Sequence, residues 1–228
     1  MKTTGGSDEA KRRAGESAAA LVESGTTVGL GTGSTAAHAI RRLGERVAAG
    51  AEIVGVPTSF QSRELAREVG IPIRTLDEVD GIDLAIDGAD QVAAFDLVKG
   101  GGAAHAREKV IDSFAERFVV VVDPSKQVDV LSHPVPVEVL PDAHTTIARA
   151  VRDAGGDPTL RRAERKDGPV VTDNGNLLLD CEFGEITDAA ALARTLAAVP
   201  GVVEHGLFVD MADEIHVGTA EGVTVSER

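Results

Sequence analysis

The feature that most limits the possible folds of this chain is the order of its first half, where short apolar runs alternate with amphipathic stretches. Runs such as TTVGLG (26–31) and FVVVVD (118–123) are almost entirely apolar, which is typical of strands buried on both faces of a parallel sheet. This alternation predicts an α/β fold with a parallel sheet. The expected strands are 26–31, 52–58, 71–76, 82–87 and 118–123. The expected helices are 8–24, 34–50 and 59–70, and a glycine-rich turn followed by a helix is expected within 99–118.

The pattern changes near residue 131. HPVPVEVLP (133–141) carries three prolines, which favours an edge strand or a domain crossing over a central strand. The residues that follow approximate the order β-α-β-β-α-β of a smaller ferredoxin-like α+β domain. Its later elements are helix 144–154, strand 159–165, strand pieces within 168–183 that flank the hairpin-turn signal DNGN, helix 188–198 and strand 202–209.

The last residues suggest that the chain returns to its first domain. EIHVGTAEGVTVSE (214–227) has the alternation of further strand. We therefore expect a larger parallel-sheet domain made of residues 1–130 plus 206–228. Residues 131–205 form the small domain, which we expect to contribute to oligomer contacts.

The charge balance excludes several classes of protein. The formal net charge is -14, from 37 acidic and 23 basic residues, so a broad basic face for nucleic acid is not expected. Only 6 of the basic residues are lysine, and Trp and Tyr are absent. Such a composition resembles the proteins of salt-loving microbes, and an acidic bacterial enzyme from a GC-rich genome is the alternative.

Other absences point to a cytoplasmic protein. No apolar run approaches the roughly 20 residues that span a bilayer, and the N-terminal residues lack the apolar core of a secretory signal. Cys181 is the single cysteine and lies in an apolar run, so a buried, unreactive thiol is expected. The six histidines show no metal-ligand spacing, and each is expected to be hydrogen-bonded or exposed.

GLGTGSTAAHA (29–39) is the first segment with possible chemistry. A predicted strand runs through Gly31 to Thr35 into a helix, so backbone N–H groups and hydroxyls meet at a helix N-terminus. That arrangement suits an anion such as phosphate. The segment is neither G-x-G-x-x-G nor a Walker loop. A tight turn with Ser34 or Thr35 as a plain N-cap explains it equally well.

DGAD, from Asp87 to Asp90, follows the predicted strand 82–87. The carboxyl ends of strands in open α/β sheets are where ligands bind. Two carboxylates three residues apart could contact sugar hydroxyls or a metal. Taken alone, the segment is more simply read as a turn.

The run Lys99-Gly100-Gly101-Gly102 opens the next helix. Consecutive glycines allow a ligand to approach backbone N–H groups closely. They also cost stability, so their presence at a helix start favours a function. Lys126 follows the buried strand 118–123 and could reach the same edge of the sheet, although a solvated loop lysine is the simpler interpretation.

Glu108 lies on this helix in one stripe with Ala104 and Ile111. The stripe borders the apolar residues Val110 and Phe114, which predicts that Glu108 is half-buried. Partial burial raises the pKa of a carboxyl group toward the range useful to a general base. On the helix pattern alone, a surface glutamate paired with a neighbouring charge is the simpler interpretation.

Taken together, the segments resemble one known family. GLGTGSTAAHAI, DGADQV, KGGGAAHAREK, VDPSKQVDVL, PVPVEVLP and VVTDNGN occur in the order found in ribose-5-phosphate isomerases of the A type, from about Ala10 to the C-terminus. Each block is weak, but the ordered set is highly specific. The resemblance implies interconversion of ribose 5-phosphate and ribulose 5-phosphate in the pentose phosphate pathway. It also implies a Rossmann-like lobe with a small α/β lobe, no metal or other cofactor, and a homodimer or homotetramer.

The family's functional residues carry over to matching letters. Glu108 of R-E-K takes the place of the catalytic glutamate, with Asp87 and Lys99 as further catalytic residues. His105-Ala106 stands where the family carries other residues and leaves the functional letters unchanged. The implied substrate-binding residues are Thr32, Gly33, Ser34, Thr35, Asp87, Gly88, Ala89, Asp90, Lys99, Gly100, Gly101, Gly102 and Lys126.

The resemblance also implies a mechanism through a cis-enediol(ate). Glu108 moves the proton between C2 and C1, and Lys99 with the Gly100–Gly102 backbone meets the charge on oxygen. Asp87 assists ring opening and proton movement between oxygens, and Asp90 binds hydroxyls. The 32–35 turn holds the phosphate, with Lys126 or Lys99 supplying charge.

Two other functions fit parts of the sequence. An amino-sugar-phosphate deaminase could share the lobe and the phosphate turn, but the K-G-G-G and R-E-K letters count against it. A sugar-phosphate sensor domain of a transcription regulator normally carries a DNA-binding module, and the chain has neither spare length nor a basic helix.

Overall fold

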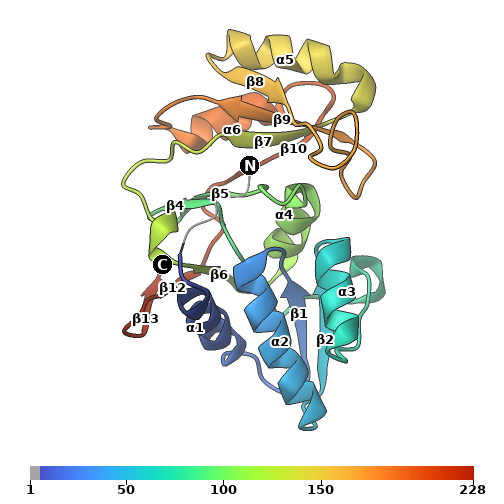
Figure 1. Ribbon diagram of the computed structural model, residues 1–228, viewed down its shortest axis with the longest axis vertical. Coiled ribbons are helices and arrows are strands. Elements are labelled where there is room, and N and C mark those ends of the chain that lie inside the picture. The colour runs from blue at the N-terminus through green and yellow to red at the C-terminus, as the bar shows by residue number, and fades with distance from the viewer. Residues whose placement is uncertain (1–5) are drawn as a thin grey trace. The chain divides into compact units, whose positions relative to one another are not determined.

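The computed structural model describes residues 6–228 (Figure 1). Residues 1–5, the start of the segment expected to lack a secretory signal, lie outside the described residues. The chain forms two compact units, which are described separately. The larger unit comprises residues 6–89, 107–127 and 210–228, and the smaller unit comprises residues 90–106 and 128–209.

The larger unit is built on a mostly parallel sheet of order β13-β12-β6-β3-β1-β2. Only the pair formed by the last two strands is antiparallel. All residues of the central strand Phe118–Val122 are buried, which confirms the prediction from its apolar run. The strands are β1 Thr26–Leu30, β2 Ile53–Pro57, β3 Leu84–Asp87, β6 Phe118–Val122, β12 Glu214–Gly218 and β13 Val223–Glu227.

The sheet confirms the expected α/β fold and the return of the C-terminal segment. The strand expected over 71–76 is wrong, since Ile73 makes only an isolated bridge to Gly55. The opening helix also ends earlier than predicted, at Ala19 rather than Ser24, because the chain turns before Gly25 (φ 91°). The helices are α1 Asp8–Ala19, α2 Ser34–Ala48, α3 Phe60–Glu68 and α4 His105–Phe114, with short 3-10 turns η1 Leu76–Glu78 and η2 Pro124–Lys126.

Helices α1 and α2 pack closely because a glycine lies between them. A Cβ atom on Gly15 would lie 2.8 Å from the backbone nitrogen of Ala39 and 2.9 Å from the carbonyl oxygen of Thr35. The helices share one apolar core with the sheet. This packing fixes α2, whose first residues follow the glycine-rich turn.

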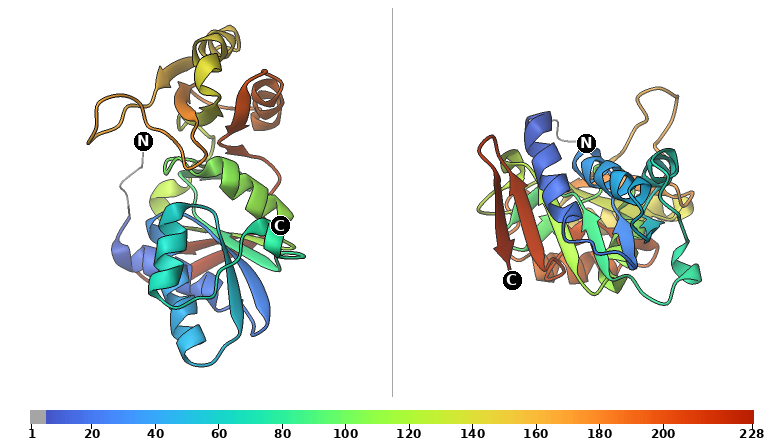
Figure 2. Two further views of the ribbon diagram at one scale, coloured as in Figure 1. Left: turned by 90° about the vertical axis from the view of Figure 1, so that its right-hand side faces the viewer. Right: turned by 90° about the horizontal axis from the view of Figure 1, so that it is seen from below.

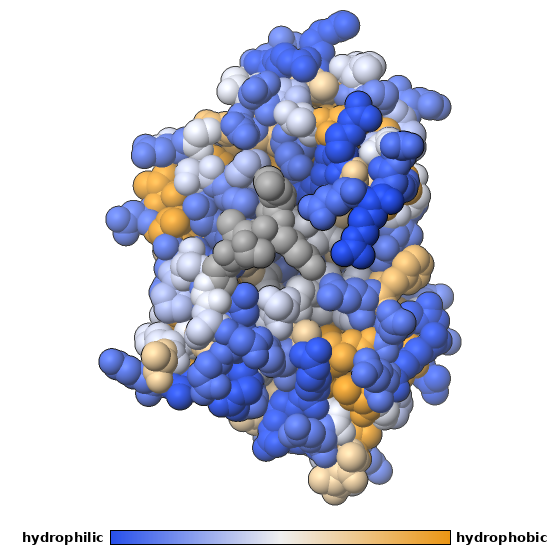
Figure 3. All heavy atoms as spheres, in the orientation of Figure 1, coloured by the Kyte–Doolittle hydropathy of each residue, from blue (hydrophilic) through white to orange (hydrophobic). Residues whose placement is uncertain are grey.

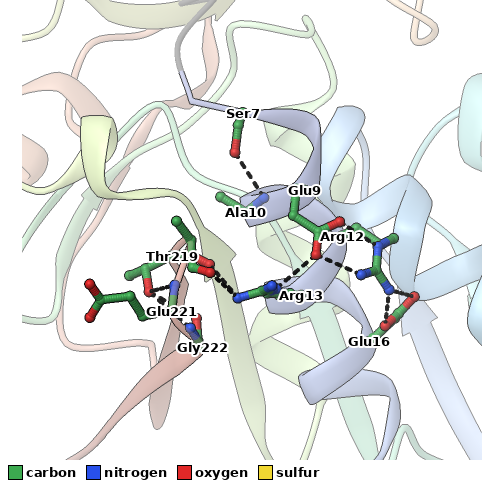
Figure 4. A network of polar contacts seen from close by, with 10 residues as sticks. Ser7, Glu9, Ala10, Arg12, Arg13, Glu16, Thr219, Glu221 and Gly222 are labelled. Carbon is green, nitrogen blue, oxygen red and sulfur yellow. Dashed lines mark hydrogen bonds and ion pairs between the residues drawn. The ribbon is translucent and has the colours of Figure 1, made fainter.

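The first helix is also tied to the last hairpin (Figures 2 and 4). Arg13 donates a hydrogen bond to the carbonyl oxygen of Thr219 at 3.2 Å and another to Glu9 at 2.8 Å. Arg12 bridges Glu9 and Glu16. Hydrogen bonds from Arg12 and, to a smaller extent, from Arg13 lower the pKa of Glu9 to about 2. The termini of the described chain are therefore held together by polar contacts and by the sheet.

The smaller unit contains an antiparallel sheet of order β10-β7-β9-β8. The element order β7-α5-β8-β9-α6-β10 confirms the predicted ferredoxin-like arrangement. Both helices share one apolar core with alternate residues of β7. The elements are β7 Val135–Val139, 3-10 turn η3 Pro141–Ala143, α5 His144–Asp153, β8 Asp157–Leu160, β9 Leu177–Glu182, α6 Ala189–Ala197 and β10 Val202–His205.

Strand β7 lies between two neighbours, so the prediction of an edge strand was wrong. Pro136 pairs with Asp180 of β9 on one side. Its carbonyl oxygen accepts a hydrogen bond from Gly206 on the other side, beyond the last pair of β10 with β7, His205 with Val137. The N and C=O of one residue face the same side of a strand, so the nitrogen of Pro136 also faces the β10 side. The N–H that proline lacks would therefore lie where the ladder with β10 ends, and no hydrogen bond within the ladder is lost.

A small sheet of order β11-β5-β4 was missed from the sequence. Its strands are β4 Gln91–Ala93, β5 Asp96–Val98 and β11 Leu207–Phe208. The strand expected over 202–209 is broken at Gly206, where a Cβ atom would lie 2.2 Å from the carbonyl oxygen of Lys99. The sheet therefore holds the residue that precedes the three glycines.

The face drawn in Figure 3 is covered mainly by hydrophilic side chains. Among the described residues, no helix is long and apolar enough to cross a membrane.

Candidate active site

The first candidate segment forms a turn between β1 and α2. Gly33, with φ 108°, is the N-cap of α2, and no side chain caps the helix. The alternative in which Ser34 or Thr35 is the N-cap is therefore wrong. The first N–H groups of α2 are not covered by a capping side chain, which suits the binding of an anion.

Asp87 joins this turn to the end of β3. Its side chain is fully buried, and Oδ1 accepts hydrogen bonds from the N–H groups of Thr32 at 2.9 Å and Gly88 at 2.7 Å. A Cβ atom on Gly31 would lie 2.2 Å from that oxygen. A glycine is thus required for the two segments to meet at the carboxyl edge of the sheet.

Two hydroxyl residues at this edge were not predicted. The hydroxyl of Thr32 lies 2.8 Å from that of Thr58 and donates to Ser59 at 2.7 Å. Thr58 and Ser59 are buried, and Ser59 also caps α3. They directly follow β2, so the strand-end rule that singled out Asp87 could have found them.

Glu108 lies in the first turn of α4 and is only 3% exposed. Ala104 and Ile111 of its stripe are also buried, so Glu108 is buried more deeply than the half-burial expected, and the surface interpretation is wrong. The apolar residues expected to border the stripe are on the opposite side, since Val110 is 53% and Phe114 is 48% exposed. At about 100° per residue, position 110 lies some 200° from position 108.

Lys126 lies in η2, after the end of β6, and is 8% exposed. Asp123 caps this turn by accepting a hydrogen bond from the N–H of Ser125 at 2.9 Å. Lysine is rarely buried to this extent without a partner or a function. The interpretation of Lys126 as a solvated loop residue is therefore wrong.

The other candidates belong to the smaller unit. Lys99 is 2% exposed, and its Nζ lies 5.2 Å from the ring centre of Phe208. Asp90 accepts a hydrogen bond from the N–H of Gly101 at 2.6 Å. Gly100 has φ 105°, and a Cβ atom there would lie 2.7 Å from Nδ1 of His105. A Cβ atom on Gly101 would lie 2.5 Å from Oδ1 of Asp90, so the geometry of the turn requires glycine at both positions 100 and 101.

The structure thus brings Thr32 and Asp87 together in one unit, and Asp90 and Gly101 in the other. Glu108 and Lys126 lie in the larger unit with the 32–35 turn, and Lys99 lies in the smaller one. Within residues 6–228, no group of three or more acidic, histidine or cysteine side chains could hold a metal ion.

Two histidines and the single cysteine have the surroundings that were predicted for them. His38 lies 3.1 Å from Asp8, and the buried His216 lies 2.9 Å from the hydroxyl of Ser17. Cys181 is fully buried, and burial together with Asp180 raises the pKa of its thiol to about 12. Such a thiol is unreactive in the folded protein.

Comparison with known proteins places the chain among relatives of one kind. Residues 54–222 match the family model described as ribose 5-phosphate isomerase A (phosphoriboisomerase A). The ribose-5-phosphate isomerase A of Haloarcula marismortui is 71% identical and covers 97% of this chain and 96% of its own length. That of Halorubrum lacusprofundi is 66% identical over the full length of both chains. Both sources are halophilic archaea, in agreement with the acidic composition.

Solved structures give the same result. A ribose-5-phosphate isomerase in complex with phospho-erythronic acid is 45% identical and superposes with a TM-score of 0.95. The match covers 98% of this chain and 100% of the other.

Proposed function

The chain belongs to the ribose 5-phosphate isomerase A family, and from this premise we propose that it interconverts ribose 5-phosphate and ribulose 5-phosphate with Glu108 as its base. The observation that carries the assignment is the burial of a carboxyl group in the first turn of α4, shortly after the glycine turn. The carboxyl group of an exposed glutamate would behave much as it does in water. Burial disfavours the charged form of a carboxyl group, which makes it a better proton acceptor.

The reaction begins on the open-chain aldose. Glu108 removes the proton from C2, the electron pair forms the C1–C2 double bond, and negative charge collects on O1. Asp87 moves the proton of the C2 hydroxyl to O1. Glu108 then returns its proton to C1, which leaves a carbonyl group at C2 and completes the ketose. No group is gained or lost, so the step needs no co-reactant.

The charge on O1 is met by donors of the glycine turn. Lys99 supplies a buried positive charge, and the turn supplies backbone N–H groups. The N–H of Gly101 already donates to Asp90. The N–H of Gly102 is therefore our candidate for the oxygen, and Asp90 orients the turn in addition to contacting hydroxyls.

The phosphate group is assigned to the turn from Thr32 to Thr35. The uncapped N-terminus of α2 offers N–H donors, and the exposed hydroxyl of Ser34 adds a further one. Because Lys126 belongs to the same unit as this turn, we assign the charge on the phosphate to Lys126 and the charge on O1 to Lys99. Gly88 and Ala89 complete the substrate-binding set.

The test of the base is Glu108→Gln. The amide keeps the shape of the side chain but cannot accept the proton, so kcat is expected to fall by about 10²–10⁴-fold with KM little changed. Glu116→Gln is the matched control, since Glu116 is exposed just beyond the same helix. Conversion of ribose 5-phosphate in a coupled assay measures both. Near wild-type kcat in Glu108→Gln would overturn the assignment.

We also propose that the chain works in the cytoplasm as a homodimer or homotetramer. Large apolar side chains are exposed in the smaller unit, with Leu140 50%, Val171 48% and Val203 42% exposed. They support a contribution of residues 131–205 to the contacts between copies. Light scattering of the purified chain, with Val203→Asp as a variant in the edge strand β10, measures the assembly. A monomer in the wild type contradicts this proposal.

A further inference from the structure

Arg161 is a largely buried cation that neither the sequence motifs nor the proposed mechanism includes. It follows β8, and its backbone continues the ladder by donating to the carbonyl oxygen of Leu178 at 2.9 Å. Its guanidinium forms a bidentate ion pair with Asp180 of β9. Nε donates to Oδ2 at 2.8 Å, and Nη2 donates to Oδ1. The side chains of Arg161 and Asp180 are only 11% and 21% exposed. The cation is thus anchored to the sheet of the smaller unit before it contacts anything else.

The third arm of the guanidinium reaches the glycine turn. Nη1 of Arg161 donates to the carbonyl oxygen of Gly100 at 3.1 Å and to that of Gly101 at 3.2 Å. The same Gly100 oxygen accepts the N–H of Ala103 at 2.9 Å. Two successive peptide units of the turn are therefore held by one rigid, planar donor group.

These bonds fix where the N–H groups of the turn point. In a trans peptide the C=O of one residue and the N–H of the next point in opposite directions. With its oxygen on Arg161, the Gly100–Gly101 peptide directs its N–H to the carboxylate of Asp90, as observed at 2.6 Å. The Gly101–Gly102 peptide likewise turns the N–H of Gly102 away from the guanidinium.

We propose that Arg161 is a positioning residue for the isomerase reaction. It orients the peptide units of the glycine turn so that the N–H of Gly102 donates to the substrate oxygen on which charge develops. This inference rests on the proposed role of the turn. The ion pair with Asp180 largely neutralises the cation, so the effect of Arg161 is on peptide orientation rather than on the field at a distance. Hydrogen bonds to the peptide oxygens also polarise the N–H groups as donors.

The test compares Arg161→Met with Arg162→Met. Methionine keeps the length of the side chain but has no donors, and Arg162 is an exposed neighbour. Removing a donor to such an oxygen lowers kcat by about 10²–10³-fold, and misorienting one is expected to cost about 10–10²-fold. KM for ribose 5-phosphate should change by less than about threefold. The affinity for phospho-erythronic acid should fall by about the same factor as kcat/KM, because a carboxylate resembles the charged intermediate more than the substrate.

Two further variants separate orientation from folding. Arg161→Lys keeps the cation but cannot hold Asp180 and both carbonyl oxygens together, so its kcat should lie between those of wild type and Arg161→Met. Asp180→Asn keeps the shape of the anchor and should lower kcat less than Arg161→Met. Circular dichroism identifies any variant that fails to fold. If Arg161→Met does not fold, the kcat values of Arg161→Lys and Asp180→Asn decide whether Arg161 positions the turn.

The results distinguish this inference from the proposed function. Wild-type kcat and inhibitor affinity in folded Arg161→Met would overturn the positioning role and leave the isomerase assignment intact. A loss that appears only in KM, or equally in Arg162→Met, would also overturn it. If wild-type protein and Arg162→Met both fail to convert ribose 5-phosphate, the proposed function itself is wrong.

Discussion

Gly31 lies so close to Asp87 that no side chain fits between them, and Gly31→Ala tests this packing directly. The new Cβ atom would lie 2.2 Å from Oδ1, 2.3 Å from Cγ and 2.6 Å from Cα of Asp87. The last of these atoms belongs to β3, which lies between β1 and β6, so it cannot move away without distorting the sheet. The carboxylate must therefore shift, and its bond from the N–H of Thr32 is lost or lengthened.

These contacts set the size of the loss in the free energy of unfolding. Overpacking of this kind costs about 1–3 kcal/mol, and a hydrogen bond to a charged group contributes about 1.5–3 kcal/mol. The two terms overlap because one movement relieves both, so we expect a loss of about 3 kcal/mol. For a chain of this size, Tm falls by roughly 2–4 °C per kcal/mol, or about 10 °C here. A displacement of about 1 Å at a reacting group lowers kcat by about 10²-fold.

Thermal unfolding by circular dichroism and the coupled isomerase assay measure the two effects, both in high KCl. Gly81→Ala is the matched control, because no atom lies within 4 Å of the Cβ position and its φ is not positive. It should leave Tm within about 2 °C and kcat unchanged, since surface changes rarely exceed about 0.5 kcal/mol. Gly31→Ala with wild-type Tm and kcat would refute the reasoning from the Gly31–Asp87 contact.

Three further predictions use other parts of the chain. Burial lowers the pKa of His216 below its ordinary value of 6.5, so the unfolded chain binds a proton there at a higher pH than the folded chain; stability should fall as the pH drops below about 6.5. His216→Gln should weaken that fall in Tm, and an unchanged pH dependence would contradict it. Cys181 should react with a thiol reagent only after denaturation, and labelling of the native protein at the rate of a free thiol would show that the strand opens. Activity should survive exhaustive EDTA treatment, whereas a loss restored by a divalent metal would overturn the metal-free mechanism.

Much of the fold follows from local patterns. The continuous apolar run of β6 and the helical periods between strands predicted the parallel sheet, because each depends on neighbours in the sequence. The position of β7 was not predictable in this way. Pro136 fits between two neighbouring strands because the hydrogen-bond ladder with β10 ends beside it. The end of that ladder lies at Gly206, some 70 positions later in the chain.

The candidate site shows the same division. Asp87 and the 31–35 turn were found because strand ends and glycines are visible in sequence. Burial of Glu108 was predicted correctly but partly for a wrong reason, since Val110 faces away from it. Arg161 carries no motif, and its role depends on a carbonyl contact with a turn about 60 residues earlier.

The pairing of the first helix with the last hairpin has a consequence for biosynthesis. Helix α1 packs on β12, where a Cβ atom on Gly218 would lie 1.9 Å from the carbonyl oxygen of Ala10. On the ribosome, α1 emerges first, and the strand on which it packs emerges more than 190 residues later.

 Contacts between residues so distant in sequence slow folding. Until β12 is released, β6 is an open sheet edge, exposed to pairing with other chains. The sheet of the larger unit can therefore be completed only after β12 has been synthesised. A stalled or truncated chain ending near residue 209 is expected to aggregate.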